Sequence, residues 1–173
     1  MKLDEVKNLI RDIPDFPKPG IMFKDITPIL QDPDACETIV SCFCSRLPNN
    51  KIDCVAGIES RGFLFGPMIA NQLKVPFVPI RKKGKLPYKV FSEKYDLEYG
   101  KAEIEVHQDA ITSRMNVLIH DDLLATGGTV NAAINLVKKL NAKPFALAFV
   151  IELSFLNAAK KFNLKNVVSL LKY

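Results

Sequence analysis

Short apolar runs alternate with helix-like segments along most of the chain. The runs with the length and composition of buried strands are residues 54–58, 77–80, 117–119, 146–151 and 167–171. The segments between them that predict helices are residues 33–47, 66–73, 130–140 and 157–162. Strands that alternate with helices are typical of a parallel twisted sheet flanked by helices, so the sequence predicts an α/β fold.

The first third of the chain has a different pattern. Residues 3–10 place four apolar side chains on one helical face, and 12–14 end that helix. The following residues, up to 33, are loop-like and rich in Pro and Asp, and Asp32 is the expected N-cap of the next helix. No repeat or linker divides the chain. We therefore expect a single domain over residues 1–173, with a small N-terminal part of about residues 1–33 and a core of about 34–173.

One basic segment lies between the second and third predicted helices. Residues 81–100 are basic, aromatic and without periodicity, and five of their Lys and Arg residues fall within nine positions. Residues 103–107 then alternate apolar and polar side chains, which predicts a half-buried strand. Taken alone, the charge cluster is more typical of a solvated loop than of a binding site.

Composition places the chain among globular proteins. Of its 173 residues 48% are hydrophobic and 25% charged, which excludes a disordered chain, a fibrous repeat and a disulfide scaffold. The net charge is +5, with a pI near 9.0. A basic protein favours anionic partners, such as phosphorylated metabolites, nucleic acid or an anionic membrane surface. Charge alone does not choose among them.

The four cysteines fit no zinc-binding pattern, and the two histidines lie far from them. We interpret the cysteines as reduced thiols of a cytoplasmic protein. No apolar stretch approaches the length of a secretory signal or a transmembrane helix, so we expect no membrane partner.

Residues 117–129 carry the most specific chemistry in the chain. A buried strand is followed by Asp121 and Asp122, then by a turn of Thr and Gly residues that opens a helix. Glycines and a helix N-terminus present backbone N–H groups to a phosphate, whereas carboxylates accept hydrogen bonds from sugar hydroxyls. The combination predicts a ribose phosphate site. The alternative is a capped turn with two solvated acids. The segment lacks the Lys of a Walker loop and the G-x-G-x-x-G pattern.

The segment Asp121–Thr129 reads Asp-Asp-Leu-Leu-Ala-Thr-Gly-Gly-Thr, and it resembles the phosphoribosyl-pyrophosphate signature of the type I phosphoribosyltransferases. This sequence of residues is most similar to that of the adenine-specific family. Four further segments resemble this family in the same order, and with the signature they span nearly the whole chain: residues 16–28, 59–67, 80–87 and 97–103.

The resemblance implies an enzyme of purine salvage, which transfers the 5-phosphoribosyl group from phosphoribosyl pyrophosphate to adenine and yields AMP and pyrophosphate. It implies the type I fold with an N-terminal hood and a mobile lid at about residues 81–100, and it implies a homodimer. Mg²⁺ is expected as cofactor, bound mainly through substrate oxygens and without a direct protein ligand.

The resemblance also implies how the two anionic parts of the substrate are bound. The ribose 5-phosphate would contact Asp121, Asp122, Ala125, Thr126, Gly127, Gly128 and Thr129. The pyrophosphate would contact Ser60, Arg61, Arg81 and Lys85, with Arg81 reaching across the dimer interface. A guanidinium suits a phosphate because its N–H groups bind two oxygens at once. An ordinary surface ion pair is the alternative for Arg61.

For the base, the resemblance implies stacking on Phe23, with Leu123 on the opposite face. Main-chain groups near Met22 and Lys24 would select adenine, and Lys24 stands where the family often has Arg. A core aromatic is the alternative for Phe23.

The catalytic residues implied by the resemblance are Glu98, Tyr99 and Arg61. Glu98 would take the proton from N7 of adenine as N9 attacks, and Tyr99 would orient the leaving pyrophosphate. Ordinary strand-start residues are the alternative for the first two. His120, where the family usually has an apolar residue, is either packed in the core or tunes Asp121.

Two other functions remain to be weighed. A phosphoribosyltransferase for another base would share the sugar site, but the hood and the segment 97–100 favour adenine. A regulator that senses the sugar substrate would also bind nucleic acid through an added segment. The first 30 residues offer one short helix and a proline-rich loop, so we expect no nucleic-acid partner.

Overall fold

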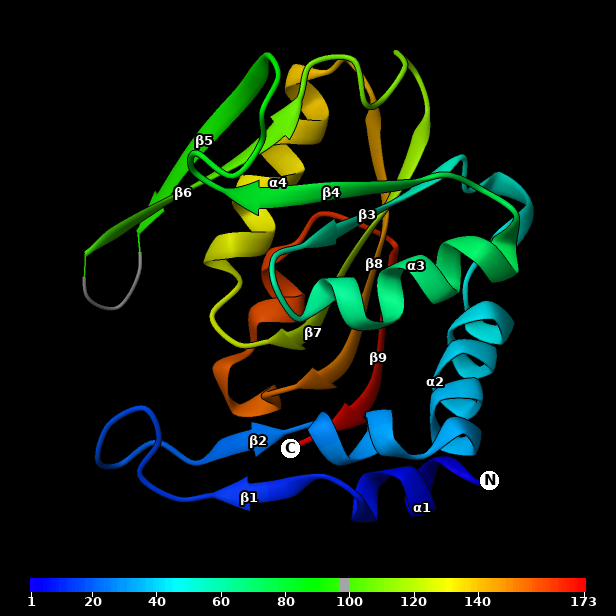
Figure 1. Cartoon of the computed structure of the whole chain (residues 1–173), viewed down its shortest axis with the longest axis vertical. Helices are drawn as coiled ribbons and strands as arrows, with labels where there is room; N and C mark the ends of the chain where they lie inside the picture. Colours follow the sequence, from blue (N-terminus) through cyan, green and yellow to red (C-terminus); the bar gives the residue numbers. More distant parts are fainter. Residues whose placement is uncertain (97–99) are drawn as a thin grey trace.

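The computed structural model describes residues 1–96 and 100–173, and its main element is a seven-stranded sheet (Figure 1). The order of the strands across this sheet is β5-β6-β4-β3-β7-β8-β9. The strands comprise β3 (Cys54–Ile58), β4 (Phe77–Lys82), β5 (Val90–Asp96), β6 (Lys101–His107), β7 (Asn116–Leu124), β8 (Lys143–Glu152) and β9 (Asn166–Lys172). The predicted α/β fold is confirmed.

The sheet is mixed, so the prediction of a purely parallel sheet needs correction. Strands β4, β3, β7, β8 and β9 pair in parallel, whereas β6 pairs antiparallel with β4 and with β5. Two strands joined by a short connection pair antiparallel, because a parallel neighbour needs a long crossover. Strand β5 lies inside residues 81–100, for which the sequence predicted no regular element.

Helices cover both faces of the sheet. Helix α4 (Gly128–Lys139) packs on one face, where its apolar side chains join those of β6 and β7 in one core cluster. Helices α2 (Pro33–Arg46) and α3 (Gly62–Leu73) pack on the other face, in a second core cluster (Figure 1). The parallel strands are therefore buried on both sides, which is why they read as continuous apolar runs.

The N-terminal part forms a layer of its own against this second cluster. It comprises α1 (Leu3–Asn8), β1 (Arg11–Ile13), β2 (Phe23–Asp25) and the 3-10 helix η1 (Thr27–Gln31). Strands β1 and β2 pair antiparallel as a separate two-stranded sheet. The prediction that the first helix runs to residues 12–14 is wrong, because residues 11–13 pair with β2 instead. We call residues 1–31 the hood segment.

Three other boundaries differ from the sequence prediction. Strand β7 continues past residue 119 to Leu124, so both acids of the signature lie within it. Helix α3 begins at Gly62, four residues before the predicted start. Residues 157–162, expected as a helix, contain only the short 3-10 helix η4 (Ala158–Lys161). Two further 3-10 helices are η3 (Ser154–Leu156), just before η4, and η2 (Asn49–Lys51), before β3.

Among the described residues, no helix has both the length and the apolar character needed to span a membrane.

Asp32 caps α2 as the sequence predicted. Its carboxylate accepts hydrogen bonds from the backbone N–H groups of Asp34 and Ala35, at 3.0 and 3.1 Å. Replacing Asp32 with alanine leaves these two groups to water and is expected to cost about 1 kcal/mol of unfolding free energy. Urea denaturation measures the loss. Asp32→Asn keeps an acceptor and is the control; an equal loss in both variants would contradict the capping role.

Candidate active site

The turn that follows β3 lies beside the two signature acids of β7. These strands are parallel neighbours, and Gly57 of β3 is opposite His120 of β7. The turn Glu59–Gly62 therefore lies next to Asp121 and Asp122. The approach is so close that a Cβ added to Gly62 would lie 2.7 Å from the carbonyl oxygen of His120. Ligands of open α/β sheets bind at this carboxyl edge.

Residues 125–127 join β7 to α4, and with the first two residues of α4 they form a small concave loop. Its cavity of about 70 Å³ is lined by residues 121 and 123–130. Gly127 has φ +88°, a left-handed conformation that favours glycine. Helix α4 starts at the next residue, and the N–H groups of a first helical turn have no intrahelical partner. The loop therefore has the geometry and the dipole of an anion-binding site.

The two signature acids are enclosed rather than solvated. Only 4% of the Asp122 side chain is exposed, and Asp121 is partly buried beside it. One carboxylate oxygen of Asp121 accepts the backbone N–H of Asp122 at 2.9 Å. The alternative of a capped turn with two solvated acids is therefore wrong.

Burial and then the neighbouring Asp122 carboxylate raise the pKa of Asp121 well above its ordinary value. Burial also raises the pKa of Asp122, although the positive charge of Arg61 opposes that rise.

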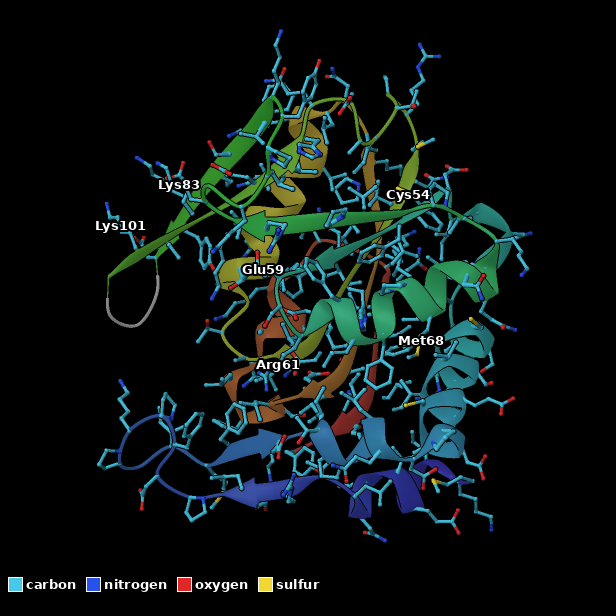
Figure 2. The ribbon with its side chains drawn as sticks, in the orientation of Figure 1. Cys54, Glu59, Arg61, Met68, Lys83 and Lys101 are labelled. Atoms are coloured by element: carbon cyan, nitrogen blue, oxygen red, sulfur yellow. The ribbon has the colours of Figure 1, made fainter. Side chains whose placement is uncertain are left out.

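Arg61 contacts both the acid pair and the hood segment. Its Nε lies 3.0 Å from Oδ2 of Asp122, forming an ion pair. This contact is outside hydrogen-bond geometry, so the buried Oδ2 accepts no hydrogen bond from the described residues. The guanidinium carbon also lies 4.9 Å from the centre of the Phe23 ring. Figure 2 shows Arg61 near the start of α3, between the sheet and the hood segment.

A second arginine, Arg81 at the end of β4, is held by Glu59. Its Nε and Nη2 donate to the two carboxylate oxygens at 3.1 and 3.4 Å, and its Nη1 donates to the carbonyl oxygen of Lys85 at 3.1 Å. Burial favours a higher pKa for Glu59, but hydrogen bonds from Arg81 and from the Lys82 N–H outweigh it and lower the pKa.

The structure thus brings Arg61, Arg81 and Lys85 to one edge of the sheet. The sequence analysis missed Glu59, whose only signal was its place in the turn with Ser60.

A larger, mostly apolar cavity of about 590 Å³ lies between the hood segment and the sheet. The predicted base-binding residues Met22, Phe23, Lys24 and Leu123 all line it. Phe23 is only partly buried, and its ring packs edge-on against Phe16 with 5.0 Å between centroids. Ala125, predicted at the ribose 5-phosphate, lines this cavity as well, and the sequence analysis missed the other lining residues: Gly20, Ile21, Leu153, Phe155, Leu156 and Tyr173. Those near the end of the chain carry no local signal, because only the fold brings them to the hood segment.

Glu98 and Tyr99 lie outside the described residues. The chain just before them approaches the loop between β7 and α4, the candidate phosphate loop, since a Cβ added to Gly128 would lie 3.3 Å from the carbonyl oxygen of Asp96. Helix α4 also holds β5, because Lys139 forms a 2.6 Å ion pair with Glu93.

His120 belongs to the core under α2. Its ring is fully buried and packs edge-on against Phe43, with 5.4 Å between centroids. Nδ1 donates to the carbonyl oxygen of Ala148 at 2.9 Å, and burial lowers the pKa of His120 to about 4. His120 is therefore neutral near pH 7, and of the two roles considered for it the structure favours packing.

The described residues contain no group of three or more His, Cys, Asp or Glu side chains that could enclose a metal ion. Asp121 and Asp122 do supply adjacent carboxylates, one with an oxygen that lacks a hydrogen bond. Hard oxygen donors of this kind suit Mg²⁺ that keeps most of its ligands from water and substrate. The residues present therefore fit a magnesium ion bound mainly through substrate.

Comparison with known proteins agrees with this geometry. The sequence model of the phosphoribosyl transferase domain matches residues 33–172. The adenine phosphoribosyltransferase of Christiangramia forsetii is 48% identical over 169 residues, covering 98% of this chain and 99% of that protein. The chain belongs to the adenine phosphoribosyltransferase family. The family member from Thermoanaerobacter sp. strain X514 is 47% identical over the full length of both chains.

Solved structures of the adenine phosphoribosyltransferase family share the whole fold. The crystal structure of the Thermoanaerobacter pseudethanolicus enzyme superposes with a TM-score of 0.96 at 46% identity, covering 99% of this chain and 100% of that one. The Saccharomyces cerevisiae enzyme, solved with adenine and an imino-altritol bisphosphate, gives a TM-score of 0.93 at 42% identity, with 98% of each chain covered.

Proposed function

We infer that the protein transfers the 5-phosphoribosyl group from phosphoribosyl pyrophosphate to adenine, yielding AMP and pyrophosphate in purine salvage. One observation carries this conclusion beyond the family relationship. Leu123 and Ala125 line both the phosphate loop and the apolar cavity, so an anion site and a base site share one wall. Asp121 also lines the cavity of the loop, and Asp122 follows it in β7. In a nucleoside monophosphate, the ribose holds the phosphate and the base close together, as these two neighbouring cavities would require.

The ribose 5-phosphate would occupy the phosphate loop. Backbone N–H groups of Thr126, Gly127, Gly128 and Thr129, and the two threonine hydroxyls, would bind the phosphate. Asp121 and Asp122 would accept hydrogen bonds from the ribose hydroxyls, and Ala125 would pack beside them. The enclosed Asp122 carboxylate supports this role, because its Oδ2 is paired with Arg61 at 3.0 Å but accepts no hydrogen bond from the described residues and can accept one from a ligand.

The pyrophosphate would bind between the turn after β3 and the end of β4. Arg61 and Arg81 would supply bidentate guanidinium groups, with Ser60 and Lys85 beside them. Both arginines already face carboxylates, Asp122 and Glu59, which hold them at this edge. Pyrophosphate would compete with these carboxylates for the same N–H groups.

Adenine would lie between Phe23 and Leu123, with main-chain groups near Met22 and Lys24 reading its edge. The apolar lining supports a flat aromatic ligand. The yeast relative was solved with adenine, and the Giardia lamblia relative, at 37% identity, with 9-deazaadenine. Glu98 would accept the N7 proton as N9 attacks the anomeric carbon, while Tyr99 and Arg61 orient the departing pyrophosphate.

Mg²⁺ would partly neutralise the pyrophosphate and so make it a better leaving group. Asp121 and Asp122 would face this ion without enclosing it, since most of its ligands would come from substrate and water.

We further propose a homodimer, a cytoplasmic location, and a mobile lid at about residues 81–100 over the hood-and-core domain. The four free cysteines support a reducing compartment. Burial and the nearby Asp53 raise the pKa of Cys54 to about 11, so this thiol is unreactive. No feature of the described residues supports binding of nucleic acid or membrane.

Base-dependent release of pyrophosphate tests the proposed function. Purified protein with Mg²⁺ and phosphoribosyl pyrophosphate is offered adenine, hypoxanthine, guanine or no base. We expect turnover with adenine alone. Turnover with an oxopurine would keep the sugar site and overturn the base assignment. Tight binding of the sugar substrate without turnover would instead favour a regulator, which filter binding of DNA at two salt concentrations would reveal.

A further inference from the structure

Tyr173 contacts both walls of the base cavity, although nothing in the signature points to it. Its backbone N–H donates to the carbonyl oxygen of Glu152 at 3.0 Å, and its carbonyl oxygen accepts the N–H of Ser154 at 2.8 Å. These bonds hold the wall formed by Leu153, Phe155 and Leu156. Figure 1 places this end of the chain beside β2, which forms the opposite wall.

The ring of Tyr173 holds that opposite wall through Lys24. The ammonium of Lys24 lies 4.0 Å from the ring centre, within range of a cation–π interaction. The same ammonium forms a 2.6 Å ion pair with Asp12, its partner across β1 and β2. Only 11% of the Lys24 side chain is exposed, so water compensates little for a lost partner. The Lys24 ammonium is thus fixed between the carboxylate of Asp12 and the ring of Tyr173.

We propose that Tyr173 is a positioning residue that sets the width of the base cavity and thereby selects for adenine over larger purines. The inference rests on the proposed function, because it assumes that adenine binds in this cavity. Phe23 is the immediate neighbour of Lys24 in β2. Any movement of Lys24 away from the sheet therefore moves the stacking ring away from Leu123 on the opposite side.

The effect is confined to the base. The phosphate loop is carried by β7 and α4, and Tyr173 does not line its cavity. Removing the aromatic ring is therefore expected to raise KM for adenine about fivefold, the range of one partly buried cation–π contact. KM for phosphoribosyl pyrophosphate and kcat stay within about twofold. The widened cavity also accepts 2,6-diaminopurine better relative to adenine.

The test compares Tyr173→Leu with Tyr173→Phe, which keeps the ring and so is expected to retain the parental KM values. Lys7→Met is the matched control. Lys7 lies 4.7 Å from the centre of the same ring but does not line the cavity, so its loss leaves KM for adenine unchanged. Hydrogen exchange of the β1 and β2 amides gives a second readout that needs no substrate, and we expect faster exchange in Tyr173→Leu alone.

An unchanged KM for adenine in Tyr173→Leu, with unchanged hydrogen exchange, would overturn the proposal. So would equal rises in both KM values, since these would indicate general destabilisation. Failure of the proposed function is distinguishable, because the unmodified protein would then release no pyrophosphate with adenine, while the exchange difference between the leucine and phenylalanine variants would persist.

Discussion

Replacing Asp122 with asparagine is expected to lower kcat/KM for phosphoribosyl pyrophosphate about 100-fold without preventing folding. The carboxylate is almost fully enclosed and pairs with Arg61 through Oδ2, which accepts no hydrogen bond from the described residues. Asparagine has nearly the same shape but presents an N–H₂ group or a neutral oxygen to the sugar. A charged hydrogen bond to a ribose hydroxyl and the anchor of Arg61 are lost together.

The same substitution is expected to maintain or increase stability at neutral pH. Burial raises the pKa of Asp121 and Asp122, so the folded protein holds these protons more tightly than the unfolded chain does. Such a group stabilises the fold at low pH, and this contribution is lost as pH rises through the folded-state pKa. Near pH 8 the ionised pair therefore opposes folding. Asparagine removes one charge and with it the repulsion.

Steady-state kinetics and thermal unfolding at pH 4.5 and pH 8 measure both effects. The difference in melting temperature, variant minus parent, is expected to be more positive at pH 8 than at pH 4.5. Asp53→Asn is the control, because it removes a carboxylate at the opposite end of β3, where it accepts the N–H of Asn116. Activity of Asp122→Asn within threefold of the parent would exclude the ribose role.

Gly62→Ala is expected to destabilise the protein by about 3 kcal/mol, because it forces α3 away from β7. The added methyl would lie 2.7 Å from the carbonyl oxygen of His120 and 3.4 Å from a carboxylate oxygen of Asp121. A backbone carbonyl in the middle of a buried strand cannot rotate away as a flexible side chain can. The helix start must move, and Arg61 moves with it. We therefore expect lower activity as well.

For a chain of this length the loss corresponds to a decrease of about 8 °C in melting temperature. Gly84→Ala separates this clash from backbone strain. Gly84 has φ +75°, but an added Cβ would meet no atom within 4 Å, so only about 1 kcal/mol is expected there. Equal losses in the two variants would show that the close approach of α3 to β7 is not the cause.

The sequence by itself determined the class of fold, and it singled out the loop between β7 and α4 as the candidate phosphate site. Both are local properties. Five buried strands read as apolar runs because each needs apolar side chains on both faces, and Asp32 caps its helix through atoms two and three residues away. The loop after β7 is likewise formed by its own backbone and by the start of α4, so consecutive residues are enough to predict its shape.

The tertiary structure alone decided which distant residues meet. Strand β5 escaped prediction because its residues lack the alternation that a half-buried strand shows, and they become ordered by packing on α4 through contacts such as Glu93 with Lys139. Local pattern alone left solvated turn acids as an alternative for Asp121 and Asp122, and only the fold, with the turn after β3 beside them, shows that they are enclosed. The contact between Glu59 and Arg81 spans 22 residues of the chain. The contact between Lys24 and Tyr173 spans 149 residues. Such pairs depend on strand order, which no local pattern encodes.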